Sequence, residues 1–422
     1  MKEQIIRVTD LPERIDFNTT FEINWDNVNY FTHGFFKYPC RFIPLIPRWA
    51  ILKYTHKDQL VLDPFAGSGT ALVEAVLNRR NALGVDFDKL SQLLCKTKTQ
   101  NLDSRQMNLL ANVERPLFSN ARIDNKFTPD IHNLSHWFPK ENIEALLKLK
   151  TTIEDKFGGT QGEKKYNFLL VCFASIIKKC SYADDTSPKP YVSKRIKKLP
   201  SMVKEAFLKT LSSYLKNMSG YENKEIGKCK VISDDARAIH AEQYNGKVNL
   251  AVTSPPYINA FDYVRSLRLE NAWLGYYGDS NILEVKRKQV GTETISSNIY
   301  SHGVEVTKYN KLDSILQEIS RKDKKRAFVV FRFFKDIEQN LNEVKRLLKP
   351  KGHYVIVVGD SKIRGINIPT HEVLIDIARR AGYSLENIFS YIIKNRYLRI
   401  PRSGRGGLIK KDWVLDLVKK NG

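Results

Sequence analysis

Short apolar runs alternate with helical patterns along much of the chain. The apolar run at residues 60–62 ends in Asp63 and leads into a turn with two glycines. Apolar residues then recur at the spacing of a helix, and a second apolar run at residues 82–85 ends in Asp86. This order of strand, turn, helix and strand predicts a parallel β-sheet with helices packed against it.

The pattern changes to helical segments and Pro-containing loops between residues 101 and 228, and strand patterns return at 230–233, 248–252 and 354–358. A helical pattern at 337–348 separates the last two strands. We therefore expect an α/β fold with a doubly wound, mostly parallel sheet and a mainly helical insert. The expected parts are a cofactor-binding half with the N-terminal segment, an insert that is the candidate target-recognition region, and a catalytic half, at residues 1–100, 101–228 and 229–422.

The charge of the chain points to a polyanionic partner. The 422 residues include 69 Lys and Arg against 46 Asp and Glu, a formal charge of +23, which favours nucleic acid ahead of a membrane surface. No stretch approaches the length of a membrane span, and the N-terminus has no secretory pattern. The five cysteines form no CxxC pair and suggest neither a metal site nor disulfides. A soluble, cytoplasmic protein is expected.

The turn after Asp63 has the features of a cofactor site. Glycines at the carboxyl end of a strand let the backbone approach a ligand at the start of the next helix. Asp86 follows Asp63 by 23 residues, where an acid can accept hydrogen bonds from ribose hydroxyls. The GxGxxG pattern is not met, because Leu72 stands at the third glycine position, and no Gly-Lys-Ser/Thr loop occurs. An adenosine-containing cofactor is expected, with a plain tight turn as the alternative.

The segment Thr253-Ser254-Pro255-Pro256-Tyr257 is the most specific motif. The two prolines end the strand and fix an extended backbone, so the Ser254 hydroxyl and the Pro255 carbonyl are rigid acceptors beside an aromatic ring. The exocyclic amine of a nucleobase is a poor nucleophile because its lone pair is delocalised, and preorganised acceptors favour a reactive geometry. The base must be flipped out of the duplex to reach such a site. A turn that only ends a strand is the alternative.

These two motifs resemble those of S-adenosylmethionine-dependent amino-group DNA methyltransferases, especially the N4-cytosine type of restriction-modification systems. Residues 37–44 resemble the family segment over the methionine end of the cofactor, and residues 234–237 the segment near the adenine. The resemblance implies a Rossmann-like class I methyltransferase fold. It implies cofactor contacts by Tyr38, Pro39, Asp63, Phe65, Ala66, Gly67, Ser68, Gly69, Thr70, Asp86 and Asp235, and catalytic roles for Ser254, Pro255, Pro256 and Tyr257.

The implied reaction is methylation of the N4 amine of a flipped cytosine at a specific site in double-stranded DNA, with a cognate restriction endonuclease that acts separately. In many N4-cytosine enzymes the catalytic motif comes first, whereas here the cofactor motif does. N6-adenine methylation of DNA is therefore the alternative, followed by an RNA or protein amino-group methyltransferase. A DNA-binding module without activity would leave Asp63, Asp86 and the Ser-Pro-Pro-Tyr segment unexplained.

The dipeptide Pro39-Cys40 resembles the nucleophile of cytosine C5 methyltransferases, which attack the ring through a thiolate. A C5 enzyme needs that cysteine in the loop after the fourth strand, where this chain has Ser254 to Tyr257. We therefore expect Cys40 to be a buried structural cysteine.

Two basic stretches are candidates for binding the DNA backbone. Residues 178–198 contain seven Lys or Arg against two Asp, and residues 394–411 contain seven and no acid. A charge run is commonly a solvated face, but a neighbouring base-modifying site favours phosphate binding. The candidate DNA-binding residues are Lys194, Arg195, Lys197, Lys198, Arg399, Arg402 and Arg405.

Overall fold

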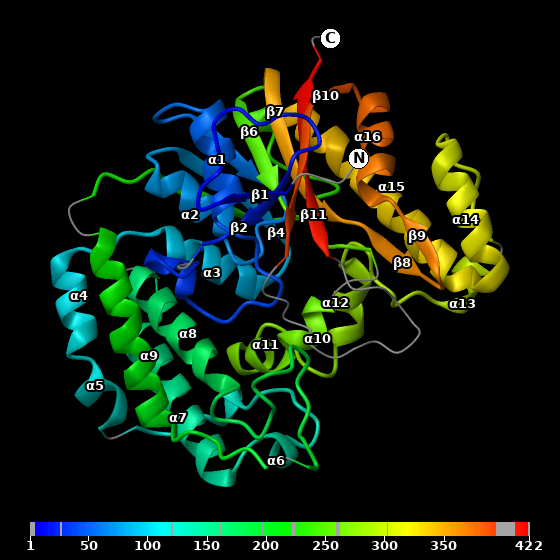
Figure 1. The fold of residues 1–422 in the computed structure, drawn as a ribbon. Coiled ribbons are helices and arrows are strands. Elements are labelled where there is room, and N and C mark those ends of the chain that lie inside the picture. Colours follow the sequence, from blue (N-terminus) through cyan, green and yellow to red (C-terminus); the bar gives the residue numbers. More distant parts are fainter. Residues whose placement is uncertain are drawn as a thin grey trace.

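A single large sheet forms the centre of the protein in a computed structural model (Figure 1). The structure describes residues 5–25, 28–119, 121–159, 163–195, 197–221, 224–258, 262–301, 303–393 and 410–420. Within these ranges nine strands follow the order β1-β2-β10-β11-β7-β6-β3-β4-β5. Three of the candidate DNA-binding residues, Arg399, Arg402 and Arg405, lie outside the described residues.

The sheet is parallel except at β11, which is antiparallel to both of its neighbours, β7 and β10. The predicted doubly wound, mostly parallel sheet is confirmed, and the five predicted strands correspond to β3 to β7. The strands of the sheet are β1 Ile5–Val8, β2 Thr20–Ile23, β3 Leu60–Asp63, β4 Asn81–Asp86, β5 Cys229–Ser233, β6 Val248–Thr253, β7 Leu348–Gly359, β10 Tyr383–Ile392 and β11 Lys411–Lys419. A separate hairpin joins β8 Ser361–Ile363 to β9 Ile366–Ile368.

Helices cover both faces of the sheet because successive strand residues point to opposite sides. Along β3, Val61 packs on the face covered by α1 and α2, whereas Leu62 packs on the face covered by α14, α15 and α16. The same alternation recurs on β7 between Val355 and Ile356. The covering helices are α1 Leu45–Tyr54, α2 Thr70–Leu77, α14 Asn310–Lys322, α15 Lys324–Leu347 and α16 Thr370–Arg380.

The predicted insert is helical and lies to one side of the molecule, away from α14 to α16 (Figure 1). Its helices are α4 Ser104–Ala111, α5 Glu114–Phe118, α6 Leu134–Trp137, α7 Lys140–Phe157, α8 Glu163–Ile177 and α9 Val203–Met218. The α8 residues Phe168 and Phe173 share one apolar core with Leu90 and Leu94 of α3 (Lys89–Thr99) and with Trp273 of α11 (Arg268–Leu274). The insert therefore shares its core with helices of the main fold.

Three further short helices, α10 Tyr263–Ser266, α12 Ile282–Lys288 and α13 Ser297–Tyr300, lie between β6 and β7 in the chain. They belong to the connection from the end of β6 to α14, which begins with the segment Ser254 to Tyr257. Among the helices of the described ranges, none combines the length and the apolar composition that crossing a bilayer requires.

Candidate active site

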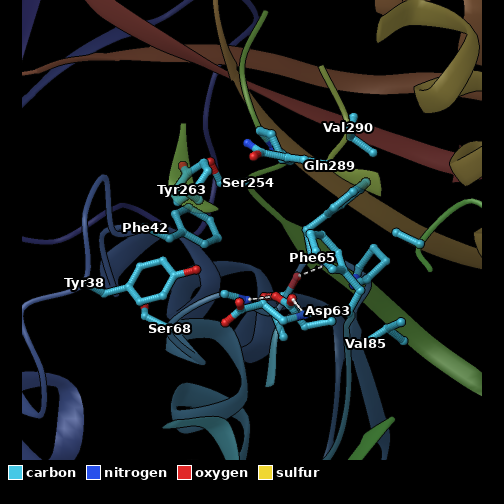
Figure 2. Close-up of a pocket in the computed structure, with 18 of the residues that line it drawn as sticks. Tyr38, Phe42, Asp63, Phe65, Ser68, Val85, Ser254, Tyr263, Gln289 and Val290 are labelled. Atoms are coloured by element: carbon cyan, nitrogen blue, oxygen red, sulfur yellow. Dashed lines mark hydrogen bonds between the residues drawn. The ribbon is translucent and has the colours of Figure 1, made fainter. Parts of the chain in front are cut away.

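One pocket lies at the carboxyl ends of β3, β4 and β6, which is where ligands bind in open α/β sheets (Figure 2). It brings together segments that are far apart in the sequence. The predicted residues that line it are Tyr38, Asp63, Phe65, Ala66, Gly67, Ser68, Thr70, Asp86, Asp235, Ser254 and Pro256. The predicted residues that do not line it are Pro39, Gly69, Pro255 and Tyr257.

The glycine turn between β3 and α2 forms the floor of the pocket. Gly67 (φ 49°) and Gly69 (φ 78°) both have left-handed backbone conformations, which glycine adopts without steric cost. The Gly67 amide donates to Asp86 Oδ2 at 2.8 Å. A Cβ atom at Gly69 would lie 3.1 Å from Cys95 Sγ in α3. The turn thus needs glycine for its conformation and for its contact with α3.

A buried lysine supports the turn from below. Lys98 of α3 is 1% exposed, and its ammonium donates to the Ser68 carbonyl at 2.8 Å. Burial lowers the pKa of this ammonium to about 7. Sequence reasoning did not find Lys98, because a lysine near the end of a helix is typical of a solvated surface.

Two carboxylates, buried Asp63 and half-buried Asp86, contribute to the negative character of the pocket. Thr253 Oγ1 donates to Asp63 Oδ1 at 2.6 Å, and the Phe65 amide donates to the same oxygen at 3.1 Å. Asp86 accepts from the amides of Gly67 and Asp88. Burial raises the pKa of Asp63 and of Asp86 to about 7. A cation bound here would stabilise the ionised carboxylates, whereas a phosphate group would be repelled.

Aromatic rings form the walls of the pocket. Tyr38 stacks against Tyr263, with ring centroids 6.1 Å apart and an interplanar angle of 29°, and its hydroxyl bonds with that of Ser91 at 3.0 Å. Figure 2 shows Tyr38, Phe42 and Tyr263 along one side of the pocket and Phe65 on the other. Flat apolar walls above acidic side chains fit an adenosine that carries a sulfonium cation.

Asp235 lines the pocket, but its carboxylate is already engaged. Arg237 donates to both of its oxygens, at 2.9 Å and 2.6 Å, and Arg237 also donates to Asp336 at 3.2 Å. Asp235 is therefore fixed in position by a bidentate pair. Its predicted role near an adenine stays a prediction.

The predicted catalytic motif leaves β6 directly beside the glycine turn. Ser254 and Pro256 line the same pocket as Asp63 and Gly67. Burial raises the pKa of Tyr257 well above its ordinary value, so the phenol is neutral at physiological pH. Asp412 is among the groups that raise the pKa of the Tyr257 phenol, and Ser254 is among those that lower it.

The prediction that Cys40 is buried is wrong. Cys40 is exposed and lines the pocket, with a left-handed backbone conformation (φ 51°). The physical reason is that residues 37–42, which we call the cover, lie over the pocket instead of entering the core. Arg41 anchors this cover by donating to the carbonyl of Val28 at 3.0 Å and to the side chain of Asn29 at 2.9 Å.

Several pocket residues escaped sequence reasoning. Phe42 stands in residues 37–44, which the resemblance identified, and Phe87 directly follows Asp86. The position of both residues next to predicted site residues could have identified them as pocket residues. Tyr263 and Gln289 offered none, because they come from connections beyond the catalytic motif that only the tertiary fold brings to the pocket.

The basic loop of the insert combines exposed and engaged cations. Lys194, Arg195 and Lys197 are exposed. Lys198 instead donates to the carbonyls of Lys178 and Ala183 and pairs with Asp185 at 2.9 Å, so its ammonium holds the loop together. The Lys37 ammonium donates to the Asp185 carbonyl at 2.9 Å, which joins this loop to the cover of the pocket.

Comparison with known proteins agrees with this geometry. Residues 12–92 match the DNA methylase family that joins N6 and N4 enzymes. The type II methyltransferase M.MvaI of Kocuria varians is 26% identical over 400 residues, which cover 89% of this chain and 86% of that protein. The type II methyltransferase M.BsoBI of Geobacillus stearothermophilus is 24% identical and covers 81% of this chain and 75% of its own.

A solved S-adenosylmethionine-dependent methyltransferase from Methanosarcina mazei is 9% identical, covers 88% of this chain and 97% of its own, and superposes with a TM-score of 0.32. The family match and the type II relatives support an S-adenosylmethionine-dependent DNA methyltransferase that acts on an exocyclic amino group.

The Asp86 carboxylate is expected to contribute directly to cofactor affinity. Asp86→Ala removes an acceptor for the ribose and also the acceptor of the Gly67 amide, so it should weaken S-adenosylmethionine binding roughly 10- to 100-fold, the loss of about 1.5 to 3 kcal/mol for a hydrogen bond to a charged group. Isothermal titration calorimetry measures this. Asp103→Ala, which removes the N-cap of α4 outside the pocket, is the matched control. Unchanged affinity in a folded Asp86→Ala protein would exclude Asp86 from the site.

Cofactor affinity is expected to rise with pH. Asp63 and Asp86 have pKa values of about 7 in the free protein, and a sulfonium favours their ionised forms, so affinity should increase roughly tenfold from pH 6 to pH 8. S-adenosylhomocysteine, which lacks the sulfonium charge, should show a smaller increase. Thr253→Val removes a hydrogen bond that lowers the Asp63 pKa, so it should move the rise to higher pH. Affinity that falls over this pH range would contradict the assignment.

Proposed function

We propose that the protein transfers a methyl group from S-adenosylmethionine to the exocyclic N4 amine of a cytosine that is flipped out of double-stranded DNA at a specific site. The observation that carries this proposal is the position of Ser254. Its side chain lines the same pocket as the glycine turn, so a neutral hydroxyl stands next to the proposed cofactor site.

The proposed roles follow from the chemistry of a conjugated amine. S-adenosylmethionine supplies an electrophilic methyl group. The Ser254 hydroxyl and the Pro255 carbonyl accept hydrogen bonds from the two amine hydrogens, which directs the nitrogen lone pair toward the methyl carbon. Tyr257 offers the aromatic face on which the flipped base stacks. The tight backbone of the two prolines keeps both acceptors fixed during the transfer.

The choice of cytosine rests on Ser254. A hydroxyl accepts from the amine as a carboxylate does but carries no charge, and the resemblance associates this Ser form with cytosine. Adenine N6 is the alternative, because its amine is conjugated in the same way and the family model covers both chemistries. An amino group of RNA is a further, less favoured alternative.

We assign the DNA backbone to the insert. The +23 charge favours a polyanion, and the exposed Lys194, Arg195 and Lys197 lie on a loop that is tied to the pocket cover through Lys37. Residues 101–228 would then read the target sequence. The resemblance to enzymes of restriction-modification systems implies a restriction endonuclease that acts separately as a partner.

The product decides the base assignment. Purified protein incubated with S-adenosylmethionine and unmethylated DNA of mixed sequence should yield N4-methylcytosine, identified by mass spectrometry of the nucleosides, with RNA treated in parallel. Ser254→Ala should reduce methyl transfer at least 100-fold, the order found for loss of one preorganised polar group, with cofactor affinity largely retained. N6-methyladenine as the sole product would overturn the base. 5-Methylcytosine whose formation requires Cys40 would overturn the mechanism as well.

Neutralising the exposed loop cations is expected to weaken DNA binding and its salt dependence. The triple change Lys194→Gln, Arg195→Gln and Lys197→Gln should reduce the slope of log K against log salt by up to about 3, since each lost phosphate contact removes about 0.9. Fluorescence anisotropy with a labelled duplex measures the slope. Glutamines at the exposed Lys148, Lys209 and Lys216 of α7 and α9 serve as the matched control. An unchanged slope in the loop variant would make that loop an ordinary solvated face.

A further inference from the structure

Lys98 is a buried cation that takes no part in the proposed chemistry. It lies near the end of α3 and is 1% exposed. Its ammonium donates to the carbonyl of Ser68 at 2.8 Å, and Ser68 lies in the glycine turn that forms the floor of the pocket (Figure 2). Lys98 itself does not line the pocket. Any influence of this lysine on a ligand must therefore pass through the turn.

A buried ammonium without an acid beside it makes a fold less stable, because the loss of water is not compensated by an opposite charge. The ionisable groups that act on Lys98 are Arg41, which repels its charge, and the thiol of Cys95, so neither is a carboxylate. An apolar side chain of similar length would fill the same space without this penalty. The buried cation therefore points to a role other than stability.

The glycine turn needs a contact that fixes its central peptide. Gly67 and Gly69 flank Ser68, and both have left-handed backbone conformations. Glycine restricts the backbone less than any other residue, so the Ser68 peptide can rotate at low energy unless it is held. Its carbonyl is held by Lys98, and the Gly69 amide of the same peptide donates to the Ala66 carbonyl at 2.7 Å. The hydrogen bond from Lys98 thus fixes one end of this peptide from outside the turn.

The backbone of Lys98 is held in turn by a short 3-10 helix, η1 Phe31–Gly34. The Thr32 hydroxyl of η1 donates to the Lys98 carbonyl at 2.8 Å. The Tyr221 hydroxyl donates to the same carbonyl at 3.2 Å. Thr32 and Tyr221 are both fully buried, so water does not compete for these bonds.

The same short helix also contacts α2 and the cover. His33 Nε2 bonds with Glu74 Oε1 of α2 at 2.7 Å, and both side chains are buried. Arg41 of the cover donates to the His33 carbonyl. Since α2 follows the glycine turn and α3 packs below it, η1 joins both supporting helices and the cover in one buried polar cluster.

We propose that Lys98 is a positioning residue for the cofactor: its hydrogen bond to Ser68 keeps the glycine turn in the conformation that binds S-adenosylmethionine, and η1 keeps Lys98 in place. Without this bond the free turn adopts other conformations for part of the time, and the apparent affinity falls in proportion to the competent fraction. Once the cofactor is bound, the turn has the same conformation with or without Lys98. The lysine therefore sets cofactor affinity and leaves the rate at saturating cofactor unchanged.

Lys98→Met tests this role, because methionine has a similar length and no donor. Isothermal titration calorimetry should show affinity for S-adenosylmethionine that is weaker by at least about tenfold, as a competent fraction of about one in ten produces. S-adenosylhomocysteine should lose affinity by the same factor, because the change is in the turn and does not depend on the sulfonium. Unchanged affinity in the folded variant would overturn the proposal. Tighter binding of S-adenosylmethionine would also overturn it, since Lys98 would then act by charge repulsion.

Steady-state methylation of DNA separates positioning from a loss of folded protein. In Lys98→Met the KM for S-adenosylmethionine should rise by the factor that calorimetry gives, whereas kcat should stay close to that of the wild type. A lysine with only a structural role would lower the fraction of molecules that bind and the apparent kcat, with the Kd of the folded fraction unchanged. The calorimetric result does not depend on which base is methylated, so failure of the proposed function is distinguishable.

Lys150→Met is the matched control. Lys150 is also a buried lysine, 4% exposed, but it lies on α7 outside the pocket and pairs with Glu154. Its substitution removes a buried ammonium and should lower the melting temperature without changing the Kd of the cofactor. Equal weakening of cofactor binding in Lys98→Met and Lys150→Met would contradict a specific role of Lys98.

Thr32→Val provides a second test that keeps the lysine. Valine has nearly the same shape as threonine but cannot donate to the Lys98 carbonyl, so cofactor affinity should fall roughly threefold, the effect of one neutral hydrogen bond. The loss in the double variant with Lys98→Met should be smaller than the product of the two single losses, because both changes act on the same contact. Thr32→Val tests the proposal even if Lys98→Met does not fold. Wild-type affinity in Thr32→Val would contradict the proposal, as would independent effects in the double variant.

Discussion

The hydrogen bond between the Thr253 hydroxyl and the Asp63 carboxylate joins the two halves of the chemistry. It is 2.6 Å long, both residues are buried, and it links positions 190 residues apart in the sequence. Thr253 is the last residue of β6 and Asp63 the last of β3, so the bond fixes how two loops leave neighbouring strands. In the proposed reaction, a methyl acceptor and a methyl donor must be held within about 0.5 Å of a productive arrangement, and this contact would set that relation.

Asp63 and Asp86 are shielded from water, fully and in part, and the resulting penalty on their ionised forms in the free protein is offset when a cation binds. Asp63 and Asp86 each accept two hydrogen bonds, which compensates part of the loss of water but supplies no positive charge. No described cation pairs with either carboxylate, since Lys98 donates instead to the carbonyl of Ser68. The site is therefore prepared for a positively charged ligand and should gain stability when one binds.

The local sequence pattern predicted the strands at the centre of the sheet. It did not predict features that depend on pairing between distant parts of the chain. The turn after Asp63 and the motif at Ser254 are strand-to-loop features whose neighbours in sequence are their neighbours in space. Strand β11 was missed because it carries Asp412 and Asp416 at buried positions, so its pattern resembles a surface segment. Tyr263 reaches the pocket only through tertiary folding, and the exposure of Cys40 depends on a cover segment that no local signal describes.

The shared core of the insert makes it unsuitable as an exchangeable cassette. Its helices pack on Leu90 and Leu94 of α3, and the opposite end of the same helix presents Lys98 to the cofactor turn. A chimera that replaced residues 101–228 would uncover the apolar side of α3 and disturb the floor of the pocket. Substitutions in the insert are therefore better made in its surface loops, with the helices beneath them left in place.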